Sequence, residues 1–162
     1  MARNITFDEL IVKISAAHVI VDEAIKPALE AASVKVKETA EQKFGHYQDS
    51  VAGGQFPAWA ALSTTYLQRK LAAGSSGDDP LIGAPGLRRD GGTPLSESIQ
   101  YTVRGLNAYI GTDSEVSEFH EFGTIHAPPR PFLRPALFQS KQQIVKNMGA
   151  AVQAALISYF GK

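Results

Sequence analysis

Two histidines and a glutamate in the second half of the chain are the residues best suited to metal chemistry. His120 and Glu121 are adjacent, and His126 follows six residues after the first histidine. Zinc peptidases that bind the metal from one helix need two histidines four residues apart, because that spacing puts both imidazoles on one face. Here the spacing is six and Gly123 interrupts the helix. A metal-dependent hydrolase built on these three residues is therefore kept only as an alternative.

No other segment has a pattern typical of catalysis. The sequence has no phosphate-binding loop that ends in Gly-Lys-Ser/Thr and no dinucleotide-binding glycine motif. The Gly-Ser-Ser-Gly run at 74–77 lacks the pattern of a nucleophile elbow. The absence of Cys excludes disulfides and thiolate metal sites. We predict a protein that is not an enzyme, with no catalytic residue, no cofactor and no metal site.

The composition is that of an ordinary globular domain. Of 162 residues, 44% are hydrophobic and 20% are charged, so we expect a single domain over 1–162. Sixteen basic and sixteen acidic residues give a net charge of zero. A neutral chain is poorly suited to coating nucleic acid or an anionic membrane. No signal peptide and no apolar stretch of about 20 residues is visible, so we expect a soluble protein made inside the cell.

The first half of the chain is expected to be mainly helical. Apolar residues at spacings of three and four predict a helix over 21–44, with Asp22 as its N-cap and Gly45 as its stop. Pro27 would either kink this helix or delay its regular part. Residues 5–10 fit either a short strand or the start of a first helix.

Two further helices are expected to frame the rest of the chain. Ser63 is a plausible N-cap for a short helix ending near Ala73. A C-terminal helix should carry Pro135 in its first turn and end near Phe160. Its apolar stripe is wider than one packing face, which is typical of a partner interface. Gly149 in the middle of this helix would allow another backbone to approach closely.

Between these helices the pattern changes to loop and strand. Residues 74–94 are rich in Gly and Pro and predict a long flexible loop insertion. Alternation of polar and apolar residues predicts strands over 98–103 and 108–111, joined by a turn into a hairpin. A short helix over 114–122, capped by its first serine, is expected to follow.

Several segments together resemble a family of tailed-phage morphogenesis proteins, the neck or tail-completion proteins encoded among head–tail joining genes. The matching runs are Ile-Gly-Thr at 110–112, Phe-His-Glu-Phe-Gly-Thr at 119–124 and Pro-Arg-Pro-Phe-Leu-Arg-Pro-Ala-Leu at 129–137, with support from Trp-Ala-Ala-Leu-Ser at 59–63 and Pro-Leu-Ser-Glu-Ser-Ile at 94–99. The likeness extends over residues 20–160. The 74–94 insertion and the acidic 114–118 stretch depart from the family pattern.

The resemblance implies an α+β fold, in which a long N-terminal helix and a C-terminal helix pack on a small antiparallel β-sheet. It also implies a structural virion protein at the head–tail junction, or neck, and not an enzyme. Copies of the chain would form a ring, six-fold in most members and twelve-fold in the alternative, through a heterologous interface. The expected neighbours are a head-completion or connector protein on one side and the tail tube or tail terminator on the other. Genome DNA would pass through the channel without sequence-specific binding, and no membrane is involved. A tail terminator that caps the tail tube is the alternative within the same class.

Eight residues in the matching segments are candidates for the ring interface. They are Glu118, His120, Glu121, Phe122, Arg130, Phe132, Leu133 and Arg134. Phe132 and Leu133 lie between two prolines, which would hold them rigidly for insertion into the sheet or a neighbour. Arg130 and Arg134 have guanidinium groups suited to bidentate pairing with a carboxylate. Glu121 is the nearest acceptor, and the pair is either a contact between subunits or a clamp within one chain.

The neutral total charge conceals a division along the chain. Residues 101–129 carry a balance of −3, whereas residues 130–162 carry +5. Complementary charge patches steer and align neighbouring subunits, as a head-to-tail ring requires. The basic end could alternatively face the passing DNA.

Overall fold

The computed structural model describes residues 6–51, 55–81 and 93–161. The elements in chain order are α1 (Phe7–Glu41), α2 (Thr64–Ala72), a 3-10 turn (Leu95–Glu97), β1 (Gln100–Arg104), β2 (Asn107–Gly111), α3 (Val116–Phe122) and α4 (Leu133–Phe160). The α+β layout of two long helices on a two-stranded antiparallel sheet confirms the expected fold class. None of the helices within these ranges is both long enough and apolar enough to cross a membrane.

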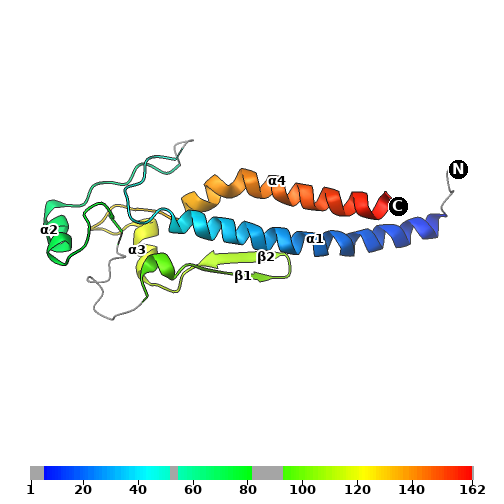
Figure 1. The fold of residues 1–162 in the computed structure, drawn as a ribbon, viewed down its shortest axis with the longest axis horizontal. Coiled ribbons are helices and arrows are strands. Elements are labelled where there is room, and N and C mark those ends of the chain that lie inside the picture. The colour runs from blue at the N-terminus through cyan, green and yellow to red at the C-terminus, as the bar shows by residue number, and fades with distance from the viewer. Residues whose placement is uncertain (1–5, 52–54, 82–92, 162) are drawn as a thin grey trace.

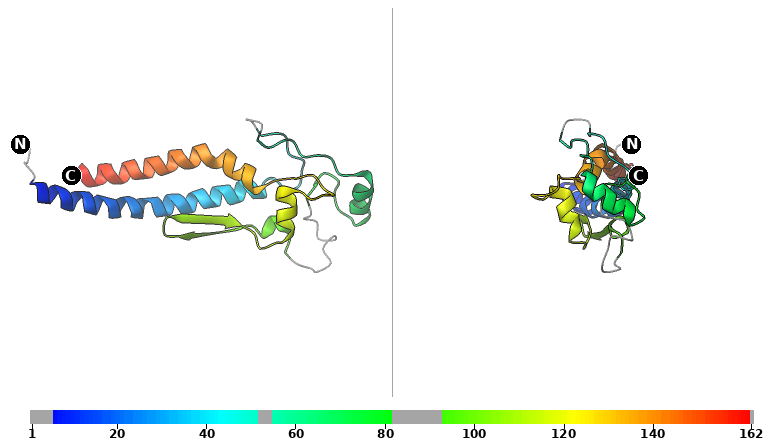
Figure 2. Two further views of the ribbon diagram at one scale, coloured as in Figure 1. Left: turned by 180° about the vertical axis from the view of Figure 1, so that it is seen from behind. Right: turned by 90° about the vertical axis from the view of Figure 1, so that its left-hand side faces the viewer.

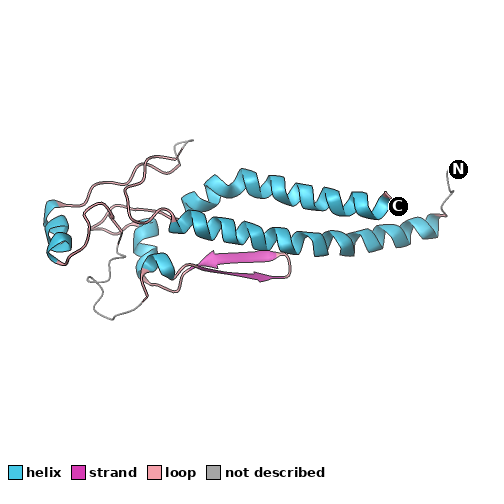
Figure 3. Ribbon diagram, viewed as in Figure 1, coloured by secondary structure: helices cyan, strands magenta, loops and turns pink. Residues whose placement is uncertain are grey.

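The molecule is elongated, with two distinct ends (Figure 1). α1 and α4 run antiparallel side by side and form what we call the arm. The hairpin lies along α1 near the other end, where α2, α3 and the connecting loops gather into what we call the base (Figures 2 and 3). The start of α1 and the end of α4 lie at the far end of the arm, and α1 projects beyond the end of α4.

α1 begins much earlier than the apolar periodicity predicts. Thr6 and Glu9 form a capping box, in which the Thr6 Oγ1 accepts from the Glu9 N–H at 3.2 Å and the Glu9 carboxylate accepts from the Thr6 N–H at 2.9 Å. The predicted start at Asp22 is therefore wrong, and residues 7–10 are helical. Pro27 lies inside α1 without ending it.

The hairpin forms as predicted. Five residue pairs join β1 to β2, from Gln100 opposite Gly111 to Arg104 opposite Asn107. Gly105 has a φ of 62° and supplies the positive φ that a two-residue hairpin turn requires. An isolated two-stranded hairpin is marginally stable in water, so its packing along α1 is what maintains it.

Two of the predicted helix starts have different outcomes. Ser63 caps α2 as expected, because its Oγ accepts from the Tyr66 N–H. The predicted Ser114 cap of α3 is wrong, since the N-cap residue is Glu115 and its side chain makes no capping bond. The Ser114 N–H instead donates to the Thr112 Oγ1 at 3.0 Å, which places this serine in the turn before the helix.

The start of the predicted 74–94 loop is irregular but packed. Residues 74–81 contain no regular element, as expected, yet Pro80 and Leu81 are fully buried. The Lys70 ammonium of α2 donates to the carbonyl oxygens of Asp79 and Leu81 and fastens this stretch to the base. The remainder of the predicted loop, at 82–92, lies outside the described residues.

The core lies where the end of α1, the start of α4 and the hairpin meet. Its buried apolar residues are Val36, Ala40, Trp59, Leu81, Leu95, Ile99, Phe132 and Ala136. The rings of Phe44 and Phe132 meet edge to face with centroids 5.2 Å apart. No atom of the described residues lies within 4 Å of a Cβ built at Gly149, so the close backbone approach predicted there does not occur within the chain.

Candidate functional site

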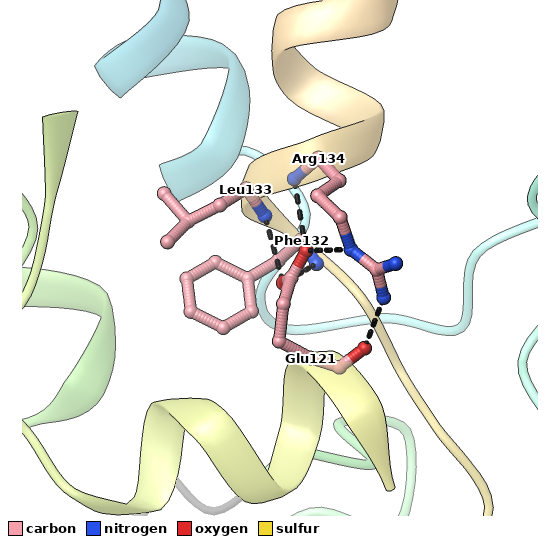
Figure 4. A network of polar contacts seen from close by, with 4 residues as sticks. All are labelled: Glu121, Phe132, Leu133 and Arg134. Carbon is pink, nitrogen blue, oxygen red and sulfur yellow. Dashed lines mark hydrogen bonds and ion pairs between the residues drawn. The ribbon is translucent and has the colours of Figure 1, made fainter.

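The Glu121 carboxylate caps the N-terminus of α4. It accepts hydrogen bonds from the backbone N–H groups of Phe132, Leu133 and Arg134 at 2.8, 3.1 and 2.9 Å (Figure 4). The first N–H groups of a helix have no partner within the helix, and α4 has no side-chain cap of its own. A negative charge at this position also compensates the helix dipole. A residue of α3 therefore fixes where α4 begins.

Arg134 completes this arrangement from the other side. Its Nε donates to the Glu121 carboxylate at 3.0 Å, and its Nη2 donates to the Glu121 backbone carbonyl (Figure 4). Its guanidinium carbon lies 4.7 Å from the centroid of the Phe122 ring. The predicted pairing of Arg134 with Glu121 is thus a contact within one chain, which is the clamp alternative.

Arg130 is a second buried link between distant segments. Its Nε and Nη2 donate to the Ala60 carbonyl at 3.3 and 2.9 Å, and its backbone N–H donates to the His120 carbonyl at 2.7 Å. Burial lowers the pKa of the Arg130 guanidinium. Burial, and next the Arg130 charge, lower the pKa of His120 to about 4, so its imidazole is neutral at pH 7.

The eight candidate interface residues divide by burial. His120, Glu121, Arg130 and Phe132 are buried within their own chain and serve to hold α3, α4 and the base together. Glu118, Phe122 and Arg134 are exposed, and Leu133 is half-buried. The exposed members are therefore the ones with side-chain surface to offer a neighbouring subunit.

Residues 6–51, 55–81 and 93–161 do not contain the set of metal ligands that the metal-hydrolase alternative requires. No group of three or more His, Asp or Glu side chains there could hold a metal ion. The Glu121 carboxylate is occupied by three backbone N–H groups and Arg134. His126 is exposed, whereas His120 is buried.

The base contains a cavity of about 540 Å³ beside this junction. Its polar lining comes from two separate stretches of the chain: Ser63, Tyr66, His120, Thr124, His126 and Arg130. Pro80 adds a third stretch to the wall. Apolar atoms, among them those of Phe119, make up most of the remaining wall. A cavity of this size with few polar groups has the character of a ligand pocket.

The arm exposes large apolar side chains along both helices. In the first four turns of α1, which we call the arm tip (residues 7–19), the exposed apolar side chains are Phe7, Leu10, Ile11, Val12, Ile14 and Val19. On α4 they are Leu137, Phe138, Val145, Ile157 and Phe160. Between the helices lies an open apolar groove of about 530 Å³ that includes Ile25, Val152 and Leu156. Contiguous apolar surface of this kind marks an interaction site.

The charges on the arm are divided between its helices. α1 carries seven acidic and four basic residues, a balance of −3, whereas α4 carries three basic residues and no acidic one, a balance of +3. Three of the five basic residues in 130–162 thus lie on α4, and the acidic helix beside it, α1, lies outside the 101–129 range that carries the negative balance in the sequence.

Two of these features, the arm tip and the cavity, are not among the predictions from the sequence. The arm tip had a usable signal, because Thr6 and Glu9 have capping-box spacing and Phe7, Ile11 and Ile14 follow at helical intervals. The cavity had no signal in the sequence, because its lining comes from stretches near 63, 80 and 125 that no local pattern connects.

No family model matches the chain, and neither a curated protein nor a solved structure is similar to it.

Proposed function

We propose that the chain is a structural protein of a tailed phage or prophage virion, forming a ring at the head–tail junction that joins the connector to the tail tube. The observation that carries the proposal is the apolar surface of the arm, above all the arm tip. Phe7 is 75% exposed and Val12 is 67% exposed, on a helix that begins with its own capping box. A well-formed helix with apolar residues on more than one face needs a partner to cover it.

The neighbouring copy of the chain is the partner that the proposal assigns to this surface. In a head-to-tail ring one patch meets a different patch on the next subunit, and the rotation closes. The acidic α1 and the basic α4 supply two such patches of opposite charge. The resemblance of the 119–124 and 129–137 segments to neck and tail-completion proteins supports the same assignment.

Self-association through the arm tip can be tested in the phage itself. The variant Ile11→Glu/Ile14→Glu places two charges on this surface, and Ile125→Glu is the matched control because Ile125 is 94% exposed in the base. We expect lysates of the arm-tip variant to contain filled heads and free tails that have not joined, while the control gives complete particles. Complete particles from a folded arm-tip variant would contradict the proposal.

Labelling of intact particles distinguishes the position of the ring. Antibodies against the chain should bind at the junction between head and tail in electron micrographs. A tail terminator would cap the growing tube, so its loss would leave tails of irregular length instead of normal unjoined tails. Absence of the chain from purified particles would refute both assignments.

A further inference from the structure

The cavity in the base is lined by a buried cation, Arg130, that has no acidic partner among the described residues. Arg130 is 5% exposed, and its Nε and Nη2 donate to the carbonyl oxygens of Ala60 and Ala61. Within the described ranges no carboxylate lies at ion-pair distance from it. Burying a charge without a counter-charge is costly, so a negatively charged partner from outside the chain would stabilise this arrangement.

The other charges near the cavity are already balanced. Burial lowers the pKa of Lys70, and the negative charge of Asp79 opposes this effect. Glu121 is paired with Arg134. Burial raises the pKa of Tyr66, so its hydroxyl stays protonated. Among residues 6–51, 55–81 and 93–161, Arg130 is therefore the unbalanced positive charge at the cavity wall.

The remaining lining provides hydrogen-bond donors and an apolar enclosure. Ser63, the N-cap of α2, lies on the wall, so the positive end of this nine-residue helix faces the same region. The exposed His126 and Thr124 belong to the solvent side of the cavity, whereas the buried Arg130 belongs to its interior. The Nη1 of Arg130 donates to no acceptor in the described part of the chain. Such a guanidinium favours a planar oxyanion, and the apolar wall favours a hydrocarbon body.

We propose that this cavity binds a carboxylate carried on a compact apolar body, with Arg130 as the anion-binding residue and His126 and the N-terminus of α2 as additional donors. The ligand is either a small organic acid or the C-terminal carboxylate of a peptide with an apolar last residue. The site is separate from the arm, so it does not depend on the proposed ring assembly. The depressed pKa of His120 agrees with a cationic, poorly hydrated interior.

The test compares carboxylates with neutral amides of the same shape. Benzoate and N-acetyl-phenylalanine are titrated by calorimetry into the full chain, in parallel with benzamide and N-acetyl-phenylalaninamide. We expect the two carboxylates to bind at least about tenfold more tightly than their amides, the effect of one charge-assisted hydrogen bond. Tighter binding of N-acetyl-phenylalanine identifies a peptide C-terminus as the ligand class, and tighter binding of benzoate identifies a small acid. Equal binding of acids and amides, or no binding of either acid, would overturn the proposal.

Two variants and a spectroscopic readout locate the binding. His126→Ala should weaken benzoate binding about two- to fivefold, whereas Arg69→Gln, an exposed arginine of α2 outside the cavity, should leave it unchanged. Arg130→Gln should abolish binding if it folds. An NMR titration of His120 in the unsubstituted chain tests the site whether or not Arg130→Gln folds. A bound anion beside Arg130 must raise the His120 pKa above about 4. An unchanged His120 titration in saturating benzoate would refute the site.

Discussion

Replacing Glu121 with alanine removes the cap of α4 and tests whether this residue acts mainly as a cap or mainly as a partner of Arg134. The carboxylate accepts three backbone N–H groups and one guanidinium N–H. Its side chain is 8% exposed, whereas that of Arg134 is 48% exposed. Alanine at 121 therefore leaves three N–H donors of Phe132, Leu133 and Arg134 without their acceptor.

The expected loss follows from these contacts. Loss of a side-chain N-cap costs about 1 kcal/mol, and a buried donor left without a partner costs about 1–3 kcal/mol. Water can reach the part-buried donors of Leu133 and Arg134, so only the buried Phe132 N–H is assigned the full penalty. The sum is about 2–4 kcal/mol for Glu121→Ala. Arg134→Ala should cost about 0–1 kcal/mol, because its ion pair is half-exposed and screened.

Urea and thermal denaturation followed by circular dichroism measure both losses. For a chain of this length, 2–4 kcal/mol corresponds to a fall in Tm of about 4–16 °C. The exchange Glu121→Arg/Arg134→Glu provides a further control. It would restore a simple ion pair, but it would place a cation against the helix N–H groups, so we expect no recovery of stability. Equal losses from the two alanine variants, or recovery in the exchanged variant, would refute the capping interpretation.

Three further predictions concern the base and the arm. The folded-state pKa of His120 lies at about 4, below the ordinary 6.5, so its contribution to stability should be constant above pH 6.5 and fall by up to about 3 kcal/mol as the pH drops to 4. His120→Gln should reduce the difference in the free energy of unfolding between pH 7 and pH 5, and an unchanged difference would contradict the assignment. Gly123→Ala should destabilise the chain by more than about 1 kcal/mol, because φ is 77° and the new Cβ would lie 2.8 Å from the Pro129 nitrogen. Gly149→Ala should stabilise the chain by about 0.5–1 kcal/mol, since no atom lies within 4 Å of the new Cβ and alanine favours the helix. A lower Tm for this variant would show that the groove does not have room for the added methyl group.

Elements governed by local spacing were predictable from the sequence. The hairpin, the Ser63 cap of α2 and the end of α3 at Gly123 follow from alternation, capping and a glycine with positive φ. The start of α1 was also encoded locally, in the Thr6–Glu9 capping box, but the exposed arm tip lacks the one-sided stripe on which the prediction of 21–44 relied. Apolar periodicity identifies helices that pack on one face, and it identifies poorly a helix that remains exposed on several faces.

Local residue patterns specify the helices, the hairpin and the division of charge, because each depends on residues a few positions apart. Contacts between distant segments make Glu121 the cap of α4, bury Arg130 against Ala60, and bring Leu81 from a Gly/Pro-rich segment into the core. Capping, burial and cavity formation depend on which distant segments meet. A carboxylate eleven residues before Phe132 reaches that N–H only because the turn after Gly123 brings α3 back against the start of α4.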